Sequence, residues 1–189
     1  MSGFTFYYDL GSPYSWVVAE RIAQSLPEAE WVPVLQPDVD DGPLWDGHRE
    51  RIYDMAQKFG LIRPRFNEER TDLAIADTRK MMLAATYAKS IGRTVAFSLA
   101  AFRQQFGAAR AVDDEETILL AAAACEMHPR ALLQALEMKS VQQSLTDAGA
   151  QLRDQIGRTE LPVLVGADGF HASEDELFMH AIEEFIDIK

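Results

Sequence analysis

The pattern of hydrophobic and polar residues changes its period twice along the chain. An aromatic run at residues 4–9 predicts a buried strand, residues 13–26 have the apolar period of a helix, and residues 31–35 predict a second strand. Pro33 has no N–H to donate to a central ladder, so the second strand is expected at a sheet edge. A right-handed crossover through the helix then makes the two strands parallel.

Helical patterns alone fill the middle of the chain, from about residue 46 to residue 156. The predicted helices are residues 49–59, 72–91, 95–106, 115–127, 130–138 and 141–156. Glycines that are expected to form left-handed caps at helix ends are Gly60, Gly92, Gly107 and Gly157. The stretch 118–125 is apolar on all sides, which predicts a helix at the centre of this helical unit.

The β pattern returns at residues 161–165, and the glycine-rich turn 166–169 leads into a short strand at 170–172. Ser173 and Glu176 have the spacing of a capping box before an amphipathic closing helix. Neither flank can form a sheet domain alone. Joined, the β-α-β and β-β-α flanks predict an α/β fold, a thioredoxin-like four-stranded mixed sheet with helices on both faces. Residues 1–45 and 157–189 would form this discontinuous domain, and residues 46–156 an inserted helical domain.

Composition and charge limit the possible partners. The chain has 189 residues and a formal net charge of -12, which argues against a nucleic acid or an anionic membrane as partner. No apolar run approaches the ~20 residues of a membrane span, and the N-terminus lacks a signal-peptide pattern. The protein is therefore expected to be cytoplasmic. No metal-ligand spacing is present among His48, His128, His171 and His180, so no metal site is expected.

The sequence contains a single cysteine, Cys125. One cysteine excludes an intramolecular disulfide and any dithiol active site within this chain. Its apolar neighbours predict a buried, inert thiol, because burial in an apolar environment disfavours the thiolate.

The step Ser12–Pro13 stands where the first strand meets the first helix. Serine followed by proline is an ordinary helix start, with Ser12 as N-cap and Pro13 at the first helical position. The same position faces the unsatisfied N–H groups and the positive dipole end of the helix, which can hold an anion such as a thiolate. The residues of this step alone leave both interpretations open.

Three stretches carry a resemblance to a known family: Phe6 to Trp16 (FYYDLGSPYSW), the second strand WVPVL, and the Leu161–Pro162 step. Together they resemble the DsbA-like branch of the thioredoxin superfamily. Within it the chain is most similar to 2-hydroxychromene-2-carboxylate isomerases and kappa-class glutathione transferases. The resemblance implies that Ser12, in place of the first cysteine of a Cys-x-x-Cys pair, holds the thiol of glutathione.

The resemblance also implies further binding residues. Pro162 would be a cis-proline facing Ser12, with the Leu161 backbone pairing with glutathione. Ser173 with Glu174 or Asp175 would bind the γ-glutamyl end, although a capping box alone also explains them. A substrate pocket would be lined by Pro13, Tyr14, Asn67 and His171, and Asn67 is equally compatible with a turn or N-cap.

The sequence departs from the family pattern in two places. Residues 171–176 (HASEDE) replace the usual Trp-Gly-x-Asp-Arg motif, and the segment 37–43 is acidic where relatives tend to carry a basic residue. Basic residues that could instead meet a substrate carboxylate are Arg49, Arg51, Arg63 and Arg65, although surface charges explain them more simply.

The first hypothesis for function is a glutathione-dependent isomerase or transferase acting on a small electrophilic molecule. The alternative is a redox-inactive thioredoxin-like protein that binds a ligand without turnover. A third hypothesis is a thiol oxidoreductase that uses external glutathione. A homodimer follows from the family alone.

Overall fold

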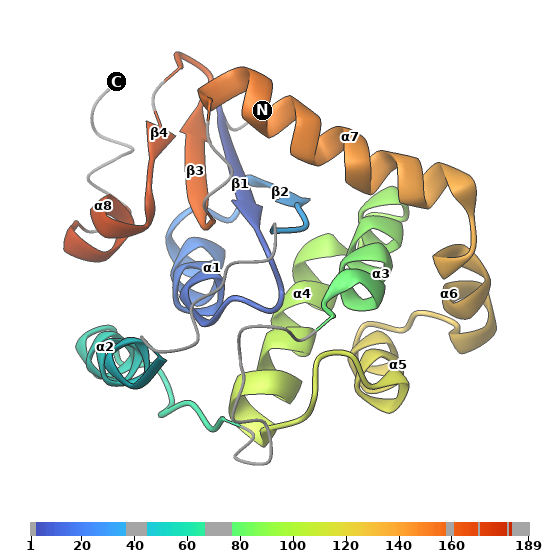
Figure 1. The fold of residues 1–189 in the computed structure, drawn as a ribbon, viewed down its shortest axis with the longest axis horizontal. Coiled ribbons are helices and arrows are strands. Elements are labelled where there is room, and N and C mark those ends of the chain that lie inside the picture. The colour runs from blue at the N-terminus through green and yellow to red at the C-terminus, as the bar shows by residue number, and fades with distance from the viewer. Residues whose placement is uncertain are drawn as a thin grey trace.

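The computed structural model describes residues 3–36, 45–66, 77–157, 161–169, 171–180 and 182. Its four-stranded sheet has the order β2-β1-β3-β4 (Figure 1), with β1 Phe4–Tyr8, β2 Glu30–Pro33, β3 Val163–Gly166 and β4 His171–Ala172. β1 pairs in parallel with β2 and antiparallel with β3, and β4 is antiparallel to β3. The predicted mixed sheet is confirmed, with β2 at the edge that Pro33 requires.

The two faces of the sheet are buried in different hydrophobic clusters. Phe6 and Tyr8 belong to the larger cluster, which includes α1 (Pro13–Ser25) and most of the helical unit. Tyr7, which points to the opposite face of the strand, packs with residues of α7 (Lys139–Ile156). Figure 1 shows α7 running across one side of the sheet and α1 on the other. Because α1 follows β1 after a short loop, the N-terminus of α1 lies at one end of the sheet.

The remaining helices are α2 (Trp45–Lys58), α3 (Arg79–Ser90), α4 (Thr94–Phe102), the π-helical segment η3 (Arg103–Gly107), α5 (Glu115–Ala124), α6 (Pro129–Leu136) and α8 (Glu174–Met179). They follow the predicted order. The helix predicted over residues 72–91 is shorter within the described residues, because Asp77 is not helical and Thr78 is the N-cap of α3. Left-handed glycine caps are confirmed at Gly60, Gly92 and Gly157.

The prediction of a glycine cap at position 107 is wrong. Gly107 is the last residue of η3, and Ala109 adopts the positive φ of 57° instead. The carbonyls at this helix end have other partners, because Phe106 accepts the N–H of Arg65 and Gln104 accepts that of Arg110. A left-handed glycine is therefore not needed to satisfy them.

The prediction that residues 118–125 form the centre of the helical unit is also wrong. Ile118 and Ala121 are fully buried, but Leu120 is 36% exposed and Ala124 is exposed. The helix lies at the margin of the molecule in Figure 1. Alanine is small enough to be tolerated on either face, so an alanine-rich pattern does not show which face is buried.

The closing helix is interrupted at His180. α8 ends at Met179 and His180 is extended, while Ile182 is again helical. Residue 181 lies outside the described part. Side chains from other elements take the last carbonyls: Arg21 donates to Leu177 and His180, and Lys58 donates to Phe178. Cations at a helix C-terminus stabilise such an end. Residues 183–189 lie outside the described part.

None of the helices in the described ranges has the length and hydrophobicity needed to cross a membrane. The same residues contain no group of three or more histidine, cysteine, aspartate or glutamate side chains arranged to hold a metal ion.

Candidate functional site

Ser12 is the N-cap of α1, as the sequence predicts. Its backbone is extended, with φ -84° and ψ 118°, and its Oγ accepts the N–H of Ser15 at 3.2 Å. The Ser12 N–H donates to the carbonyl of Asp9 at 3.2 Å, which closes a tight turn between β1 and α1. The side chain is half-buried. One lone pair of Oγ is thus used by the helix, and its O–H proton can still point to a ligand.

Pro162 precedes β3, at the same end of the sheet as this turn. The Leu161–Pro162 peptide bond is cis, the conformation that the resemblance implies. In the antiparallel pairing Tyr7 lies opposite Val163, so the start of β3 and the end of β1 lie at the same end of the sheet. Leu161 and Pro162 are both buried, at the end of the sheet from which the chain turns into α1.

A buried carboxylate, that of Asp9, lies under the Ser12 turn. Asp9 is 3% exposed, and its oxygens accept from the Gly11 N–H at 2.7 Å, the Gln36 N–H at 2.8 Å and the Thr78 hydroxyl at 3.4 Å. Burial raises the pKa of this carboxyl to about 6, against the opposing effect of the three hydrogen bonds. The sequence analysis did not select Asp9. The signal available was an acidic residue between an aromatic strand and a helix N-cap.

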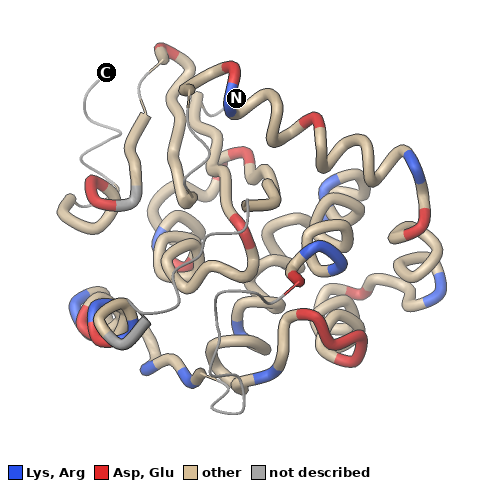
Figure 2. Tube along the Cα trace, viewed as in Figure 1, with Lys and Arg blue, Asp and Glu red and all other residues tan. Residues whose placement is uncertain are grey.

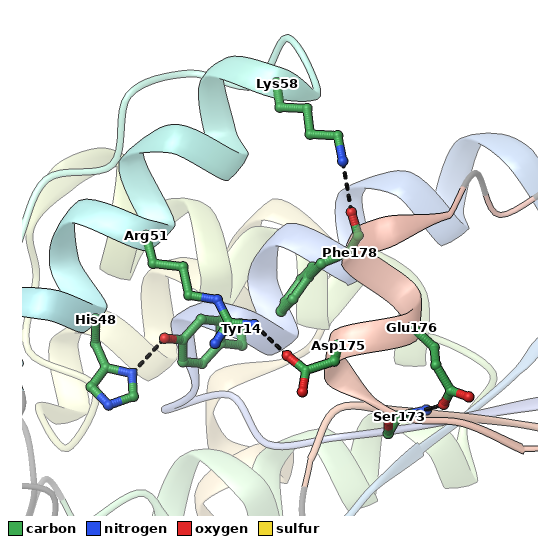
Figure 3. Close-up of polar contacts among 8 residues, drawn as sticks. All are labelled: Tyr14, His48, Arg51, Lys58, Ser173, Asp175, Glu176 and Phe178. Atoms are coloured by element: carbon green, nitrogen blue, oxygen red, sulfur yellow. Dashed lines mark hydrogen bonds and ion pairs between the residues drawn. The ribbon is translucent and has the colours of Figure 1, made fainter.

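Tyr14 joins α1 to α2 and α8 (Figure 3). Its hydroxyl lies 2.5 Å from Nδ1 of His48, and its ring centroid lies 5.6 Å from that of Phe178. The Arg51 guanidinium lies 5.5 Å from the Tyr14 ring centroid and 2.5 Å from Oδ1 of Asp175. This cluster links the three helices around the start of α1. Sequence reasoning named Tyr14 and Asp175 but did not connect them through Arg51 and His48.

The N-terminus of α8 has the predicted capping box. The N–H and the hydroxyl of Ser173 both donate to Oε2 of Glu176, at 2.8 and 2.9 Å. His171 is exposed on β4, where it pairs with Val165. The side chain of Glu174 and the whole of Asn67 lie outside the described residues. Pro13, at the first position of α1, is buried.

Three of the four arginines that the sequence analysis named lie near aromatic rings or an acid. Figure 2 shows Lys and Arg residues on α2 and on the segment after it. Arg63 lies 4.4 Å from the centroid of the Tyr53 ring, and Arg49 lies 5.5 Å from that of Phe66. Arg65 is exposed. Of the four arginines that the sequence analysis named, Arg51 is the one that the described contacts connect to Tyr14.

Cys125 is buried, as predicted. It is 5% exposed, and its S–H donates to the carbonyls of Ala121 and Ala122 at 3.4 and 3.3 Å. Burial raises the pKa of the thiol, so the reactive thiolate is disfavoured. The residue follows α5, which lies on the other side of the molecule from α8 in Figure 1.

The structure is similar to that of 2-hydroxychromene-2-carboxylate isomerase, with a TM-score of 0.79 and 17% sequence identity over 98% of this chain and 94% of that chain. It is also similar to the cytosolic disulfide reductase DsbM from Pseudomonas aeruginosa with GSH, with a TM-score of 0.71 and 14% identity over 98% of this chain and 97% of that chain. No protein-family model and no curated protein matches the chain. At these identities the similarity establishes the fold: the chain has the DsbA-like thioredoxin fold, as the sequence predicts.

Proposed function

We propose that the protein is a glutathione-dependent isomerase or transferase, in which Ser12 stabilises the glutathione thiolate. The observation that carries this proposal is the position of the Ser12 hydroxyl, at the N-terminus of α1, at the same end of the sheet as the cis-proline Pro162 that precedes β3. The two structural neighbours, an isomerase and a disulfide reductase with GSH, support it. The one cysteine of this chain is buried elsewhere, so the thiol has to come from a ligand.

The helix N-terminus and the Ser12 hydroxyl together can supply the free energy needed to lower the pKa of a bound thiol. Lowering the pKa of a thiol from about 8.5 to about 7 requires about 2 kcal/mol. A helix N-terminus contributes about 0.3–2 kcal/mol, and a hydrogen bond to a charged group about 1.5–3 kcal/mol. Ser12 can supply the second contribution because its hydroxyl accepts the Ser15 N–H while donating its own proton to the sulfur.

Glutathione, when bound, would supply a thiolate that adds to a conjugated small molecule, and the adduct either reverses after bond rotation, giving an isomer, or persists as a conjugate. The protein's own contribution is to orient the sulfur and stabilise charge. Ser12 and the first turn of α1 would hold the sulfur. The Leu161 backbone would bind the peptide part, and Tyr14 and His171 would line the substrate side together with Asn67 and the buried Pro13.

The γ-glutamyl end would bind at the start of α8, near Ser173, Glu174 and Asp175. Asp175 is already paired with Arg51. Arg51 therefore competes with the ammonium group of the ligand for the Asp175 carboxylate. This ion pair is exposed, with side-chain accessibilities of 43% and 80%. Exposed pairs contribute only about 0–1 kcal/mol, so exchange of Arg51 for the ligand ammonium is inexpensive.

Thermal shift and thiolate absorbance test the proposal together. Millimolar glutathione should raise the unfolding midpoint of the wild type, because a ligand that binds only the folded state stabilises it. In Ser12→Ala the apparent pKa of the bound thiol should rise. S-methylglutathione serves as the control, since it lacks an ionisable thiol and should bind both proteins equally. A wild type with no shift at millimolar glutathione contradicts the proposal.

A second candidate function is that of a redox-inactive protein that binds a ligand without turnover. The specific observation in its favour is that Ser173 and Asp175 both have partners within the chain, Glu176 and Arg51. The assay that separates the two is conjugation of glutathione to 1-chloro-2,4-dinitrobenzene. Binding of glutathione without turnover of this or related conjugated electrophiles would favour the second candidate. Conversion of an added disulfide would instead indicate the third hypothesis, a thiol oxidoreductase using external glutathione.

The proposal includes a cytoplasmic location, where glutathione is kept reduced. It also includes a homodimer, which light scattering would test, and a division into a thioredoxin-like domain of residues 1–45 and 157–189 with a helical domain of residues 46–156 inserted into it.

A further inference from the structure

Asp9 connects three segments that are far apart in the sequence. One oxygen accepts the N–H of Gly11, within the loop of residues 9–12 that carries Ser12 (the Ser12 loop). The other accepts the N–H of Gln36, after β2, and the hydroxyl of Thr78, the N-cap of α3. The backbone of Asp9 belongs to the same network, because its N–H donates to the Ser15 hydroxyl and its carbonyl accepts the Ser12 N–H.

The packing at this point is tight. A Cβ atom at Gly11 would lie 2.3 Å from Cγ2 of Thr78, so the Ser12 loop and the start of α3 are in direct contact. The Leu10 N–H is directed to Sδ of Met82, one turn further along α3, at 3.2 Å. The Ser12 loop is thus in contact with α3 on one side, and its backbone donates to the Asp9 carboxylate. These contacts fix the loop in which Ser12 lies.

We propose that Asp9 is a positioning residue of the candidate site: its carboxyl group fixes the Ser12 loop to the end of β2 and to α3, and these contacts support binding at Ser12. Asp9→Asn replaces one carboxyl oxygen by an NH2 group that cannot accept, so one of the two backbone N–H groups, of Gly11 or of Gln36, loses its acceptor. The geometry of Ser12 therefore depends on a side chain that does not touch the ligand. The binding part of this inference rests on the proposed function.

The groups around Asp9 support a titration of this one carboxyl. Tyr8 precedes it on β1 and is fully buried, and burial raises the pKa of its phenol, so it stays neutral. On α3 the charged neighbours of Thr78 are Asp77 and Arg79, and both are exposed. At α1 the first titratable residue is Tyr14, which pairs with His48. The described part of the segment after β2, residues 34–36, contains no titratable side chain.

A negative charge near a bound thiolate also has an opposing effect, because like charges raise each other's pKa. The two effects predict opposite results. If positioning dominates, Asp9→Asn weakens glutathione binding at pH 7.5. If repulsion dominates, Asp9→Asn tightens it. The carboxylate oxygens are directed to Gly11, Gln36 and Thr78, and not to the Ser12 hydroxyl, so we expect positioning to dominate.

The first test uses the protein without ligand. In NMR spectra between pH 4.5 and 7.5, the amide signals of Gly11, Gln36 and Ser12 should titrate together in the wild type. They should not do so in Asp9→Asn, whereas Asp77→Asn, a matched change at an exposed carboxylate next to Thr78, should leave the common titration intact. A wild type in which Gly11 and Gln36 do not share a titration, or in which Ser12 does not follow them, overturns the inference.

The second test is glutathione affinity at pH 7.5. Asp9→Asn should bind about fivefold more weakly than the wild type, the effect of about one net hydrogen bond. Equal or tighter binding by Asp9→Asn at pH 7.5 overturns the positioning role. A wild type that does not bind glutathione contradicts the proposed function instead, and the amide titration then decides the role of Asp9.

Discussion

The hydroxyl of Tyr14 lies 2.5 Å from Nδ1 of His48, and this contact joins the first turn of α1 to α2. It is the polar part of a cluster in which the Tyr14 ring also packs against Phe178 of α8 (Figure 3). The first turn of α1, which follows Ser12, is therefore connected to α2 and α8 through Tyr14.

Tyr14→Phe keeps the ring and removes the hydrogen bond. We expect it to lower the free energy of unfolding by about 0.5–1.5 kcal/mol, the net value of one hydrogen bond. A double-mutant cycle with His48→Phe, measured by urea unfolding, should give a coupling energy of similar size. Tyr53→Phe on α2 is the control, since the described residues give its hydroxyl no hydrogen-bond partner. A coupling energy near zero would show that the contact has no energetic role.

Substitutions of Ser12 separate its structural role from its proposed chemical role. Ser12→Ala removes an N-cap and should lower stability by about 0.5–2 kcal/mol. Ser12→Asp keeps an efficient N-cap but places a negative charge where the thiolate would bind. It should therefore retain most of the stability and lose glutathione binding in the thermal-shift assay.

The matched control is Ser144→Ala within α7, where Oγ donates to the Ser140 carbonyl. It should change the stability by less than about 0.5 kcal/mol, as surface substitutions usually do. If Ser12→Asp binds glutathione as the wild type does, the sulfur does not lie beside residue 12.

Gly11→Ala should be destabilising by about 1–3 kcal/mol, because the new Cβ would overlap Cγ2 of Thr78 at 2.3 Å. Thr78→Ser removes that methyl group and keeps the hydroxyl that bonds to Asp9. The double variant should thus recover most of the lost stability in chemical unfolding. Gly47→Ala in α2, where nothing lies within 4 Å of the new atom, is the control and should be neutral or stabilising. Failure of Thr78→Ser to compensate would mean that the strain lies elsewhere.

The raised pKa of Asp9 gives a prediction for the pH dependence of stability. The folded-state pKa of about 6 exceeds the ordinary value of 3.8 because of burial. The contribution of this group to stability is then fully present below about pH 4 and is lost as the pH rises through 6, a change on the order of 3 kcal/mol.

Asp9→Asn should flatten this fall in the free energy of unfolding between pH 4.5 and 7, measured with urea. Its absolute stability is not diagnostic, because the amide cannot accept from both N–H groups. Asp77→Asn should retain the wild-type slope. Equal slopes in the wild type and Asp9→Asn would show that Asp9 ionises as an ordinary surface acid does. The charged form of Asp9 lowers stability, so its presence at neutral pH is consistent with a role in function.

Local rules predicted much of the fold. Pro33 located the sheet edge, Ser12 and Pro13 located the start of α1, and Ser173 with Glu176 located that of α8. Each of these assignments depends on residues close in sequence. The interruption of the closing helix at His180 involves distant partners, such as Arg21 donating to Leu177 and His180, which periodicity does not report.

The residues of the candidate site likewise fall into those that local motifs predict and those that depend on distant partners. The N-cap role of Ser12 and the cis bond at Pro162 could be predicted from the sequence because they lie in short motifs. The network of Asp9 was not, since two of its three donors, Gln36 and Thr78, lie 27 and 69 residues away. The residue type alone does not distinguish a buried carboxylate from a solvated one, and only the fold provides the burial that raises its pKa.

The buried position of Cys125 has a practical consequence for measurement. A protein with one inaccessible thiol accepts a fluorescent or spin label only where a second cysteine is introduced. A cysteine placed at position 12, at the helix N-terminus, would be such a site, and its reaction rate with a thiol reagent would report the local electrostatic potential without any ligand.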